Sequence, residues 1–432
     1  MVNGTGGTGE AGRALGRRVR EVDVLIVGAG PAGLTAAEHL AAADCGTVEV
    51  LEREQQAGGV PRHCHHGGFG TPWTSGPRFA AARSRAATDA GAVVRTSTTV
   101  TGIPEARTVD VTGPDGLERI TARALVLATG ARERPRAARL VPGTRPAGIL
   151  TTGELQQAVH LYGQYVGRRA VVVGTEPVAY AALDTLRRAG VTVVAQLTDL
   201  DRPQIPPLRA ADARLRRTVP LLTRTTLTEV LGRGRLTGVR LRHADGRTTQ
   251  VPCDTLVFTG DFVPEAELAR GAGLRMDRAT RGPLVDTAFR TDVPGVFAVG
   301  NVLHAAETAA TAAAEGHTAA AAVRRLLAHE DRPHAFGPQL AVAPPLRWIT
   351  PGRLPRDLPA DDTQRFLVRA AEPLPARGGA TLTVTQDGRT LHSERVRGPL
   401  RTGNSREISG SWVRDAALDG GPIHVTLAAT RR

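Results

Sequence analysis

Three glycines with the spacing GxGxxG are the residues of this sequence whose types and spacing point most directly to chemistry. They are Gly28, Gly30 and Gly33 of the segment GAGPAG, which follows directly after the apolar run VDVLIV. In such a turn the first glycine permits a sharp bend, the second lets the backbone approach a pyrophosphate, and the third lets a helix pack on the strand. Glu52 ends the next apolar run, where a carboxylate binds a ribose diol. These residues predict a dinucleotide-binding site.

A second turn of the same kind departs from this pattern at its middle position. It reads Gly-Thr-Glu-Pro-Val-Ala, so that Glu176 stands where the second glycine belongs. A carboxylate there clashes with a pyrophosphate and repels its charge. The following strand ends in Gln196, with neither an acidic residue for a ribose nor an arginine pair for a 2′-phosphate. We therefore expect a degenerate nucleotide site at Gly174, Glu176 and Ala179, which disfavours NAD(P) as a cofactor; a working NAD(P)H site is the alternative.

The segment GGVPRHCHHGGFG, residues 58–70, gathers polar side chains between glycines that let the backbone approach a flat ligand. Consecutive side chains rarely converge on one ion, so we expect no metal site here. The remaining interpretations are a structural histidine cluster and a polar lining of a cofactor face, in which a cation binds a substrate carboxylate and a histidine acts as a base. A thiol beside such a cation could have a low pKa. The candidate catalytic residues of this segment are His63, Cys64 and His65, and its candidate cofactor-binding residues are Gly59 and Arg62.

A late strand and helix supply a third set of candidates. The run VPGVFAVGN ends in Gly300 and Asn301 and precedes an alanine-rich helix that begins near residue 306. The N-terminus of that helix would stabilise negative charge on a reduced isoalloxazine ring, and an ordinary core helix is the alternative. His304 lies between the turn and the helix and is a further candidate base.

These turns require parallel strands that end where the glycines stand. Two more apolar runs, ALVLATG and TLVFTG, also end in threonine and glycine. The order predicts an α/β fold with two Rossmann-like three-layer domains, one inserted in the other, followed by a small C-terminal antiparallel β domain without a chemical motif. The expected parts are a disordered leader at 1–20, a first dinucleotide-binding domain at 21–150 and 262–330, an NAD(P)-binding-like domain at 151–261, a linker at 331–362 and the β domain at 363–432.

Composition excludes several other classes of function. The 432 residues carry a net charge of +13 and all 55 cations are arginine, so there is neither a Schiff-base lysine nor a Walker A lysine. The arginines are scattered and only 3% of the residues are aromatic, so we expect no nucleic-acid partner. The three cysteines form no CxxC, which disfavours a structural zinc, an iron–sulfur cluster and a redox dithiol, and indicates the cytoplasm. No stretch contains the roughly 20 apolar residues of a membrane-spanning helix.

Together these motifs resemble the two-dinucleotide-domain FAD oxidoreductases, the pyridine nucleotide-disulfide oxidoreductase group that includes glutathione and thioredoxin reductases. GGVPRHCHH, ALVLATGARERPR, GILTTGELQQ and VGNVLHAAETA are more narrowly similar to the FAD-binding subunits of hydrogen cyanide synthase, opine oxidase and dye-linked proline dehydrogenase. The resemblance covers roughly residues 20–330 and implies FAD as the cofactor. In relatives an aspartate follows the late glycine and binds the ribityl chain, whereas Asn301 stands here and still offers a hydrogen-bonding amide. The expected FAD-binding residues are Gly28, Gly30, Pro31, Ala32, Gly33, Glu52, Arg53, Gly59, Arg62, Thr129, Gly130, Gly300 and Asn301.

The resemblance implies an FAD-dependent dehydrogenase component that oxidises an amino acid or opine-like amine at its C–N bond and passes electrons to a partner. A base near residues 63–66, or His304, would keep the amine neutral. Several relatives carry a Cys-rich iron–sulfur domain, whereas no cysteine follows Cys253 here, so we expect a partner oxidoreductase or iron–sulfur subunit. The alternative is an NAD(P)H-dependent flavin reductase that passes electrons to a ferredoxin or small acceptor. A third hypothesis is FAD with a structural role in an assembly subunit, in which the β domain docks partners.

Overall fold

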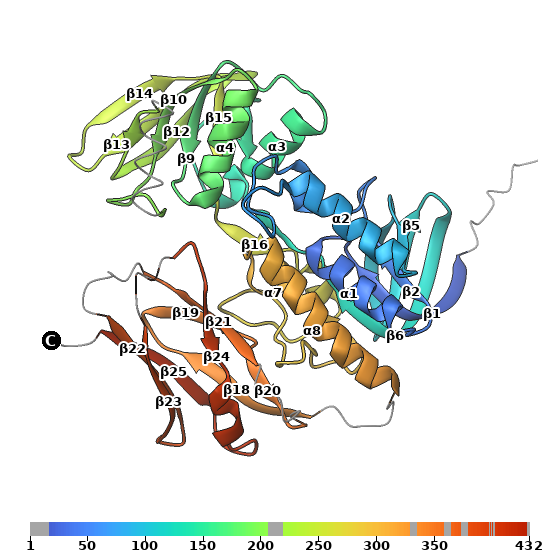
Figure 1. Cartoon of the computed structure of the whole chain (residues 1–432). Helices are drawn as coiled ribbons and strands as arrows, with labels where there is room; N and C mark the ends of the chain where they lie inside the picture. The colour runs from blue at the N-terminus through green and yellow to red at the C-terminus, as the bar shows by residue number, and fades with distance from the viewer. Residues whose placement is uncertain are drawn as a thin grey trace, which may run out of the picture.

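The computed structural model describes residues 17–205, 219–328, 335–357, 364–372, 379–396, 398, 400 and 402–429. These residues form a first α/β unit at the right of Figure 1, a second α/β unit at the top and a β domain at the lower left. The predicted fold class, two Rossmann-like α/β units with a small C-terminal β domain, is confirmed.

The first unit is built on a seven-stranded sheet with the strand order β3-β2-β1-β6-β5-β4, in which β17 also pairs with β6. β1, β2, β3, β6 and β17 are parallel neighbours, whereas β4, β5 and β6 form an antiparallel meander. All four residues of β2 and the last four of β1 are buried, as their apolar, β-branched sequences predict. The elements of this unit are β1 (Arg18–Val27), α1 (Pro31–Ala42), β2 (Val48–Leu51), the 3-10 helix η1 (Val60–His63), α2 (Gly76–Asp89), β3 (Val93–Arg95), β4 (Thr99–Glu105), β5 (Thr108–Gly113), β6 (Gly116–Leu127), α6 (Glu267–Gly271), β17 (Val296–Ala298), α7 (Asn301–His304) and α8 (Ala309–Ala328).

The second unit contains a five-stranded parallel sheet in the order β11-β10-β9-β15-β8 and a three-stranded antiparallel sheet, β12-β13-β14. Its first helix starts with a capping box in which Thr151 and Glu154 satisfy each other's backbone N–H groups. The next helix starts with Pro177, a residue that suits the first helical position. The elements are β8 (Ile149–Thr151), α3 (Thr152–His160), β9 (Arg169–Val173), α4 (Pro177–Arg188), β10 (Thr192–Leu197), β11 (Leu221–Leu222), β12 (Thr225–Arg233), β13 (Arg235–His243), β14 (Thr248–Pro252) and β15 (Thr255–Phe258).

Two short antiparallel strands, β7 (Ala131–Glu133) and β16 (Phe262–Pro264), connect the two α/β units. A 3-10 helix, η2 (Arg136–Arg139), follows β7. The predicted boundary between residues 150 and 151 is wrong, because residues 142–149 already belong to the second unit: Gly143 and Ala147 form β-bridges with β12 and β13, and β8 pairs with β15. This stretch contains no apolar run before Ile149, and its backbone pairing therefore leaves no periodic signal.

The β domain begins earlier than predicted. Strands β18 (Phe336–Val342), β19 (Leu346–Thr350) and β20 (Arg353–Pro355) lie within the segment predicted as a linker at 331–362. Of its described prolines, Pro338 lies inside β18 at a register shift and the others stand between the strands or at the end of β20. Leu340, Trp348 and Leu354 supply buried core side chains. Five strands in the order β20-β18-β25-β22-β23 and three in the order β19-β21-β24 make the two sheets. The remaining elements are β21 (Arg365–Ala370), β22 (Ala380–Gln386), β23 (Arg389–Val396), β24 (Arg406–Ser409), the 3-10 helix η3 (Ser411–Asp415) and β25 (Ile423–Ala429).

The described part of the chain begins just before β1. Most of the predicted leader, residues 1–16, lies outside the described residues, and β1 begins at Arg18, so the leader ends earlier than predicted. Arg20 of this strand pairs with Glu49 and Glu118, which anchors its start to β2 and β6.

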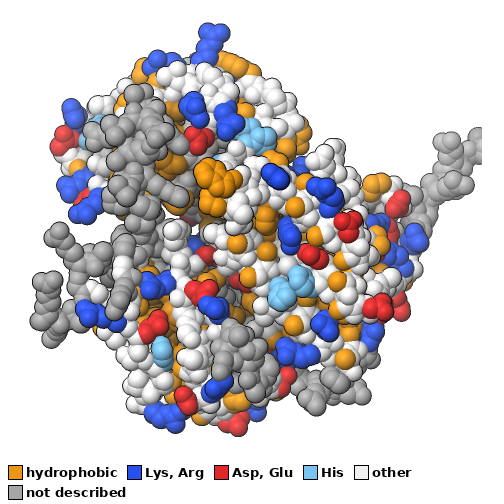
Figure 2. All heavy atoms as spheres, viewed as in Figure 1, with side chains coloured by type: hydrophobic (Ala, Val, Ile, Leu, Met, Phe, Trp, Pro, Cys, Tyr) orange, Lys and Arg blue, Asp and Glu red, His pale blue; other side chains and the backbone are white. Residues whose placement is uncertain are grey.

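On the face shown in Figure 2, arginine side chains are interspersed with acidic ones. Within the described part of the chain, no helix combines the length and apolar character that crossing a membrane requires.

Candidate functional site

The turn between β1 and α1 imposes a different constraint on each of its three glycines. A Cβ on Gly28 would come closer than 3.0 Å to the carbonyl oxygen of Ala128, and a Cβ on Gly33 would come equally close to that of Gly28. A Cβ on Gly30, in contrast, would meet no atom within 4 Å. The open space therefore lies at the N-terminus of α1, where unpaired N–H groups and the helix dipole attract phosphate. This arrangement fits a dinucleotide pyrophosphate.

Glu52 lies directly beside this turn. Its carboxylate accepts hydrogen bonds from the backbone N–H groups of Ala29, at 2.9 Å, and Glu54, at 3.0 Å. These bonds hold a buried carboxylate against the turn, at the end of β2, where a ribose diol is bound in this fold. The position of Glu52 therefore also fits a dinucleotide.

Arg53, Thr129 and Gly130 meet at Glu265, a residue that the sequence analysis did not single out. The guanidinium of Arg53 lies 3.0 Å from the carboxylate of Glu265, and the hydroxyl of Thr129 donates to its carbonyl oxygen at 2.7 Å. The N–H of Glu265 donates to the carbonyl oxygen of Gly130 at 2.9 Å. These three predicted cofactor residues are thus brought together beside β16.

The segment after β2 folds back against the nucleotide turn. Gly59 has a φ of +61°, and a Cβ on it would lie 2.9 Å from the Cα of Gly30. Only glycine permits this approach, so the segment lies against the turn. The Arg62 guanidinium donates to the carboxylate of Glu54 and to the carbonyl oxygen of Gln56, both at 3.0 Å. Arg62 is therefore held by its own segment, and its Nη1 donors are already used.

The three candidate catalytic residues that follow have different surroundings. His63 is buried, and burial lowers its pKa to about 4. Cys64 Sγ donates to the side-chain oxygen of Gln156 at 3.4 Å, and burial raises the pKa of the Cys64 thiol to about 12, so the hypothesis of a low-pKa thiol is wrong. His65 is exposed and stacks on His160 with 4.1 Å between the ring centroids. Partial burial lowers the pKa of His65, which favours the neutral imidazole that a base requires.

We expect Cys64 to resist alkylation in the folded protein. Only the thiolate reacts, and both burial and the raised pKa suppress it at Cys64. Cys45 is half-buried and should react first with iodoacetamide, whereas Cys64 and Cys253 should be labelled only after unfolding. Peptide mapping by mass spectrometry measures the order, and labelling of Cys64 before Cys45 would contradict the assignment.

Gly300 and Asn301 lie against the same nucleotide turn, but the side chain of Asn301 is used internally. A Cβ on Gly300 would lie 2.8 Å from the Cβ of Ala32. The Asn301 amide donates to the carbonyl oxygen of Glu307 at 3.1 Å and accepts from its N–H at 2.8 Å. This pair of bonds fixes the loop between α7 and α8. The replacement of an aspartate by asparagine thus has a structural role that the resemblance did not suggest.

His304 is enclosed by protein. Its Nε2 lies 2.9 Å from Glu315, whose other carboxylate oxygen accepts from the N–H of Gly300 at 2.7 Å. Burial lowers the pKa of His304, but the charge and hydrogen bond of Glu315 outweigh it and raise the pKa above its ordinary value. The imidazole is 2% exposed and stacks on Trp348 of the β domain. The structure therefore contradicts the interpretation of His304 as a base in contact with substrate.

The second nucleotide turn is filled by the protein itself. The Glu176 carboxylate accepts a hydrogen bond from the N–H of Thr175 at 2.9 Å, and a Cβ added to either Gly174 or Gly260 would lie 2.7 Å from one of its oxygens. The carboxylate thus lies between the turns that end β9 and β15, at the N-terminus of α4, where a pyrophosphate would bind. Burial raises the pKa of Glu176.

The other two positions of this second site are also used internally. Gln196 is buried at the end of β10, where a ribose-binding side chain would stand, and donates to the carbonyl oxygen of Gly174 at 2.9 Å. Ala179 is fully buried at the third position, where close packing of helix and strand is required. The fold of a nucleotide site is kept, and its ligand-binding groups are bonded to the protein.

Glu133 is a titratable residue that the sequence analysis missed. It ends β7, and its carboxylate accepts from the N–H of Gly260 at 2.9 Å and from the N–H of Gly153 at 2.8 Å. Burial raises its pKa to about 7, and the hydrogen bonds offset this only in part. It stands among arginines in ARERPR, a pattern that indicates surface charge and so gives no sign of a buried carboxyl group.

Replacing Glu133 by glutamine should change the pH dependence of stability. Because the folded protein holds the Glu133 proton more tightly than the unfolded chain, the contribution of Glu133 is fully present below its ordinary pKa of 4.5 and is lost as the pH rises through about 7. The shift corresponds to on the order of 3 kcal/mol. We expect the urea midpoint of the native protein to fall, relative to that of Glu133→Gln, between pH 4.5 and 7.5. The lowered pKa of His63 gives a pH dependence of stability with the opposite sign, but it is the same in both proteins and cancels in the comparison. Parallel curves of urea midpoint against pH for the two proteins would therefore refute the assignment.

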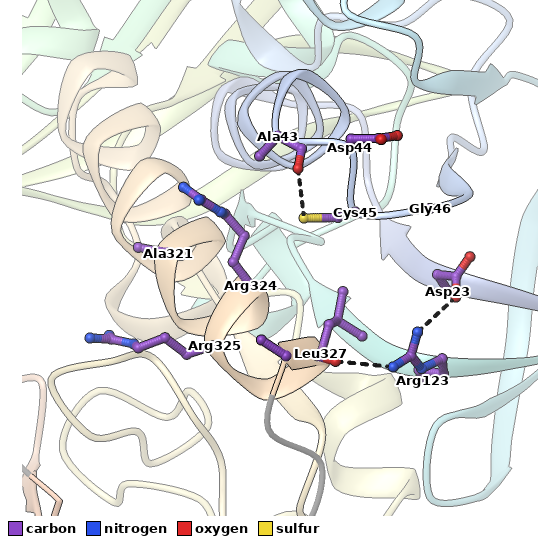
Figure 3. A pocket seen from close by; sticks show the side chains of 11 residues that line it. Asp23, Ala43, Asp44, Cys45, Gly46, Arg123, Ala321, Arg324, Arg325 and Leu327 are labelled. Atoms are coloured by element: carbon purple, nitrogen blue, oxygen red, sulfur yellow. Dashed lines mark hydrogen bonds and ion pairs between the residues drawn. The ribbon is translucent and has the colours of Figure 1, made fainter.

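A separate pocket of about 640 Å³ lies between the C-terminal ends of α1 and α8 (Figure 3). Arg123 bridges Asp23 and the carbonyl oxygen of Leu327 along one wall, and Cys45 lies opposite Arg324. Asp23 stands before the buried half of β1, whereas the glycine turn follows its end. Ligands of open α/β sheets bind at the carboxyl ends of the strands. We therefore assign the candidate site to the glycine turn and the elements around it.

A family model described as pyridine nucleotide-disulphide oxidoreductase matches residues 22–316. Ferredoxin–NADP reductase of Ignicoccus hospitalis is 28% identical over 311 residues, which cover 69% of this chain and 95% of that protein. One subunit of the opine oxidase of Rhizobium meliloti is 30% identical over 314 residues, which cover 65% of this chain and 58% of that subunit. The chain therefore spans nearly all of one relative and little more than half of the other.

Solved structures show the same fold. Thioredoxin reductase of T. acidophilum matches 71% of this chain and 98% of its own, with a TM-score of 0.60 and 23% identity. L-proline dehydrogenase of P. horikoshii matches 72% of this chain and 57% of its own, with a TM-score of 0.55 and 20% identity. The match with the proline dehydrogenase structure shows a shared fold, and the match with an opine oxidase subunit is a similarity to one of the protein groups named in the sequence analysis.

Proposed function

The chain belongs to the pyridine nucleotide-disulphide oxidoreductase family of FAD-dependent oxidoreductases, and from this membership we propose that it is a dehydrogenase component that oxidises an amino acid or opine-like amine at its C–N bond. Electrons then pass to a partner oxidoreductase or an iron–sulfur subunit. The similarity to an opine oxidase subunit supports the substrate class and the need for a partner. It extends over 58% of that subunit, so substrate and partner are parts of the proposal.

The observation that carries the proposal is the occupation of the second nucleotide turn by Glu176. A carboxylate at the N-terminus of α4, 2.9 Å from the Thr175 nitrogen, takes the donor and the space that a nicotinamide dinucleotide would need. An organic donor that reaches the first cofactor directly requires no second nucleotide site.

The residues of the first unit fit FAD. The open space at Gly30 and the N-terminus of α1 would receive the pyrophosphate, and Glu52 would bind the ribose. Gly59 and Gly300 allow their segments to lie close to this turn. Bound FAD supplies a two-electron acceptor for the oxidation of a C–N bond. The remaining predicted contacts at Pro31, Ala32, Arg53, Arg62, Thr129, Gly130 and Asn301 are part of the same proposal.

His65 is the proposed base of the site. An amine must be neutral before its α-carbon can lose a hydride, and a neutral imidazole can accept its proton. His65 is exposed and its pKa is lowered, whereas His63 and Cys64 are buried and His304 is enclosed beneath the β domain. His63 and Cys64 would therefore be buried structural residues of the same segment. A supporting test is the pH profile of flavin reduction, in which an ionisation below the ordinary pKa of histidine should disappear in His65→Ala and not in His66→Ala.

The main experiment is an anaerobic titration of the FAD-loaded protein, followed by the visible absorption of the flavin. We expect NADH and NADPH to leave the band unchanged and a secondary amine or amino acid from a substrate panel to bleach it, by itself or with a candidate partner protein. Dithionite confirms that the flavin can be reduced. Rapid bleaching by NADH or NADPH would overturn the proposal.

The second candidate function is an NAD(P)H-dependent flavin reductase that passes electrons to a ferredoxin or a small acceptor. It is favoured by the match to a ferredoxin–NADP reductase over 95% of that protein. Under this alternative Glu176→Gly should slow turnover with NAD(P)H, whereas under the main proposal it should strengthen nicotinamide binding. The two functions are thus separated by one variant.

A further inference from the structure

One loop of the β domain connects both α/β units. This loop, Thr402–Ser405, precedes β24 and is called the closing loop below. At its first residue, the hydroxyl of Thr402 donates to the side-chain oxygen of Gln204 at 3.1 Å. Gln204 in turn donates its N–H to the carbonyl oxygen of Thr175, at 3.1 Å, in the second nucleotide turn. The start of the loop is therefore attached to the second unit.

The last residue of the closing loop is attached to the first unit. Ser405 donates its hydroxyl to the carboxylate of Glu307 at 2.5 Å. The same carboxylate pairs with Arg369 of β21, whose guanidinium lies over the Trp348 ring, 4.9 Å from its centroid. Arg369 is 7% exposed, and Asn301 fixes the backbone of Glu307. The loop thus ends on a buried, charged anchor.

Between these anchors the loop lies against Glu176. A Cβ on Gly403 would be 3.9 Å from the Cβ of Glu176 and 3.1 Å from the side-chain oxygen of Gln204. Gly403 therefore lies against the Cβ of Glu176, the residue whose carboxylate occupies the pyrophosphate position. A dinucleotide would have to displace this loop as well as the carboxylate.

We propose that the closing loop is a specificity determinant that covers the second nucleotide turn, so that the β domain excludes NAD(P)H even when the Glu176 carboxylate is removed. This inference rests on the proposed function, because a protein that uses an organic donor can keep the second site closed. It gives the β domain a role in the choice of electron donor. It also predicts that Glu176→Gly strengthens nucleotide binding only modestly while the loop stays in place.

The position of the loop is tested by a disulfide. The distance of 3.9 Å between Cβ positions lies within the range of natural disulfides, so the pair Glu176→Cys and Gly403→Cys should cross-link under mild oxidation. A Cys45→Ser background removes the half-buried native thiol. We expect the double variant to lose two thiols and to migrate faster on a non-reducing gel, whereas each single variant does not. Failure of the pair to cross-link in folded, FAD-loaded protein would overturn the proposal.

The role of the loop is tested with ADP-ribose, a probe that has the pyrophosphate but no redox chemistry, by calorimetry on the FAD-loaded full chain. Thr402→Val with Ser405→Ala removes both anchors, and Thr402→Ser is the matched control that keeps a hydroxyl. In a Glu176→Gly background, we expect the anchor variant to bind ADP-ribose at least tenfold more tightly, and the control to leave the affinity unchanged. Equal affinity with and without the anchors would overturn the proposal.

These measurements are independent of the amine substrate. Cross-linking together with anchor-dependent ADP-ribose binding supports the closing loop even if no amine reduces the flavin, a result that would overturn only the proposed function. If amines reduce the flavin but the loop neither cross-links nor affects ADP-ribose, the proposed function stands and the closing loop fails.

Discussion

Replacing Gly30 by glutamate is expected to lower the affinity for FAD on the order of a thousandfold. The substitution reproduces in the first nucleotide turn the carboxylate that Glu176 supplies in the second. At about 4 Å and an effective dielectric constant of 20, its repulsion of one phosphate charge is about 4 kcal/mol, and each 1.4 kcal/mol is about tenfold in affinity. A fluorescence titration of the flavin-free protein with FAD measures the loss.

The structure provides controls for this variant. A Cβ on Gly30 meets no protein atom within 4 Å, so Gly30→Ala should keep the thermal midpoint of the flavin-free protein and most of its FAD affinity. Gly33→Ala should instead destabilise the protein, because its Cβ would collide with the carbonyl oxygen of Gly28. Retention of native FAD affinity by Gly30→Glu would show that this turn does not hold the pyrophosphate.

Replacing Arg369 by alanine is expected to reduce the stability of the folded chain by about 3–5 kcal/mol, the usual loss when one partner of a buried ion pair is removed. The Glu307 carboxylate, 7% exposed, would keep only its bond from Ser405 and lose its counter-charge. The Trp348 ring would also lose the guanidinium that covers it. Urea unfolding, followed by tryptophan fluorescence, measures the loss.

The matched control lies four residues earlier on the same strand. Arg365 pairs with Glu407, but both side chains are exposed, at 70% and 48%. Such surface pairs contribute about 0–1 kcal/mol, so Arg365→Ala should shift the urea midpoint little. Equal losses from the two variants would mean that the buried pair does not hold the β domain to the loop between α7 and α8.

The elements that carry the two nucleotide turns were predictable because their signals are local. The GxGxxG spacing itself indicates where a side chain would collide, as it does for Gly28 and Gly33, and where space must stay open, as at Gly30. Helix α4 begins and ends at the residues that the sequence indicates. Glu176 was recognised as a departure for the same reason. The pattern requires a glycine at that position, so a side chain there indicates that the space for a pyrophosphate is filled.

The parts that escaped prediction depend on contacts between segments that are distant in the sequence. His304 reads as a free base beside a glycine turn, and only the packing of Glu315 and Trp348 encloses it. Glu133 reads as one charge among arginines until Gly153 and Gly260 are seen to donate to it. The strands β18–β20 are short, and prolines lie in β18 and β20 and beside β19, so pairing with β25 and β21 rather than their own periodicity forms them.

The insertion of one α/β unit into the other has a consequence for the time course of biosynthesis. β17 joins its sheet beside β6, roughly 270 residues after the end of β1, so the ribosome must translate the whole second unit before the first sheet is complete. At 5–20 residues per second this interval is about 15–50 s. The inserted unit can fold during that time, whereas the first waits as an unfinished sheet. Loading of the flavin is therefore a late event. Until then, the nascent first unit is the part of this chain that most needs protection by chaperones.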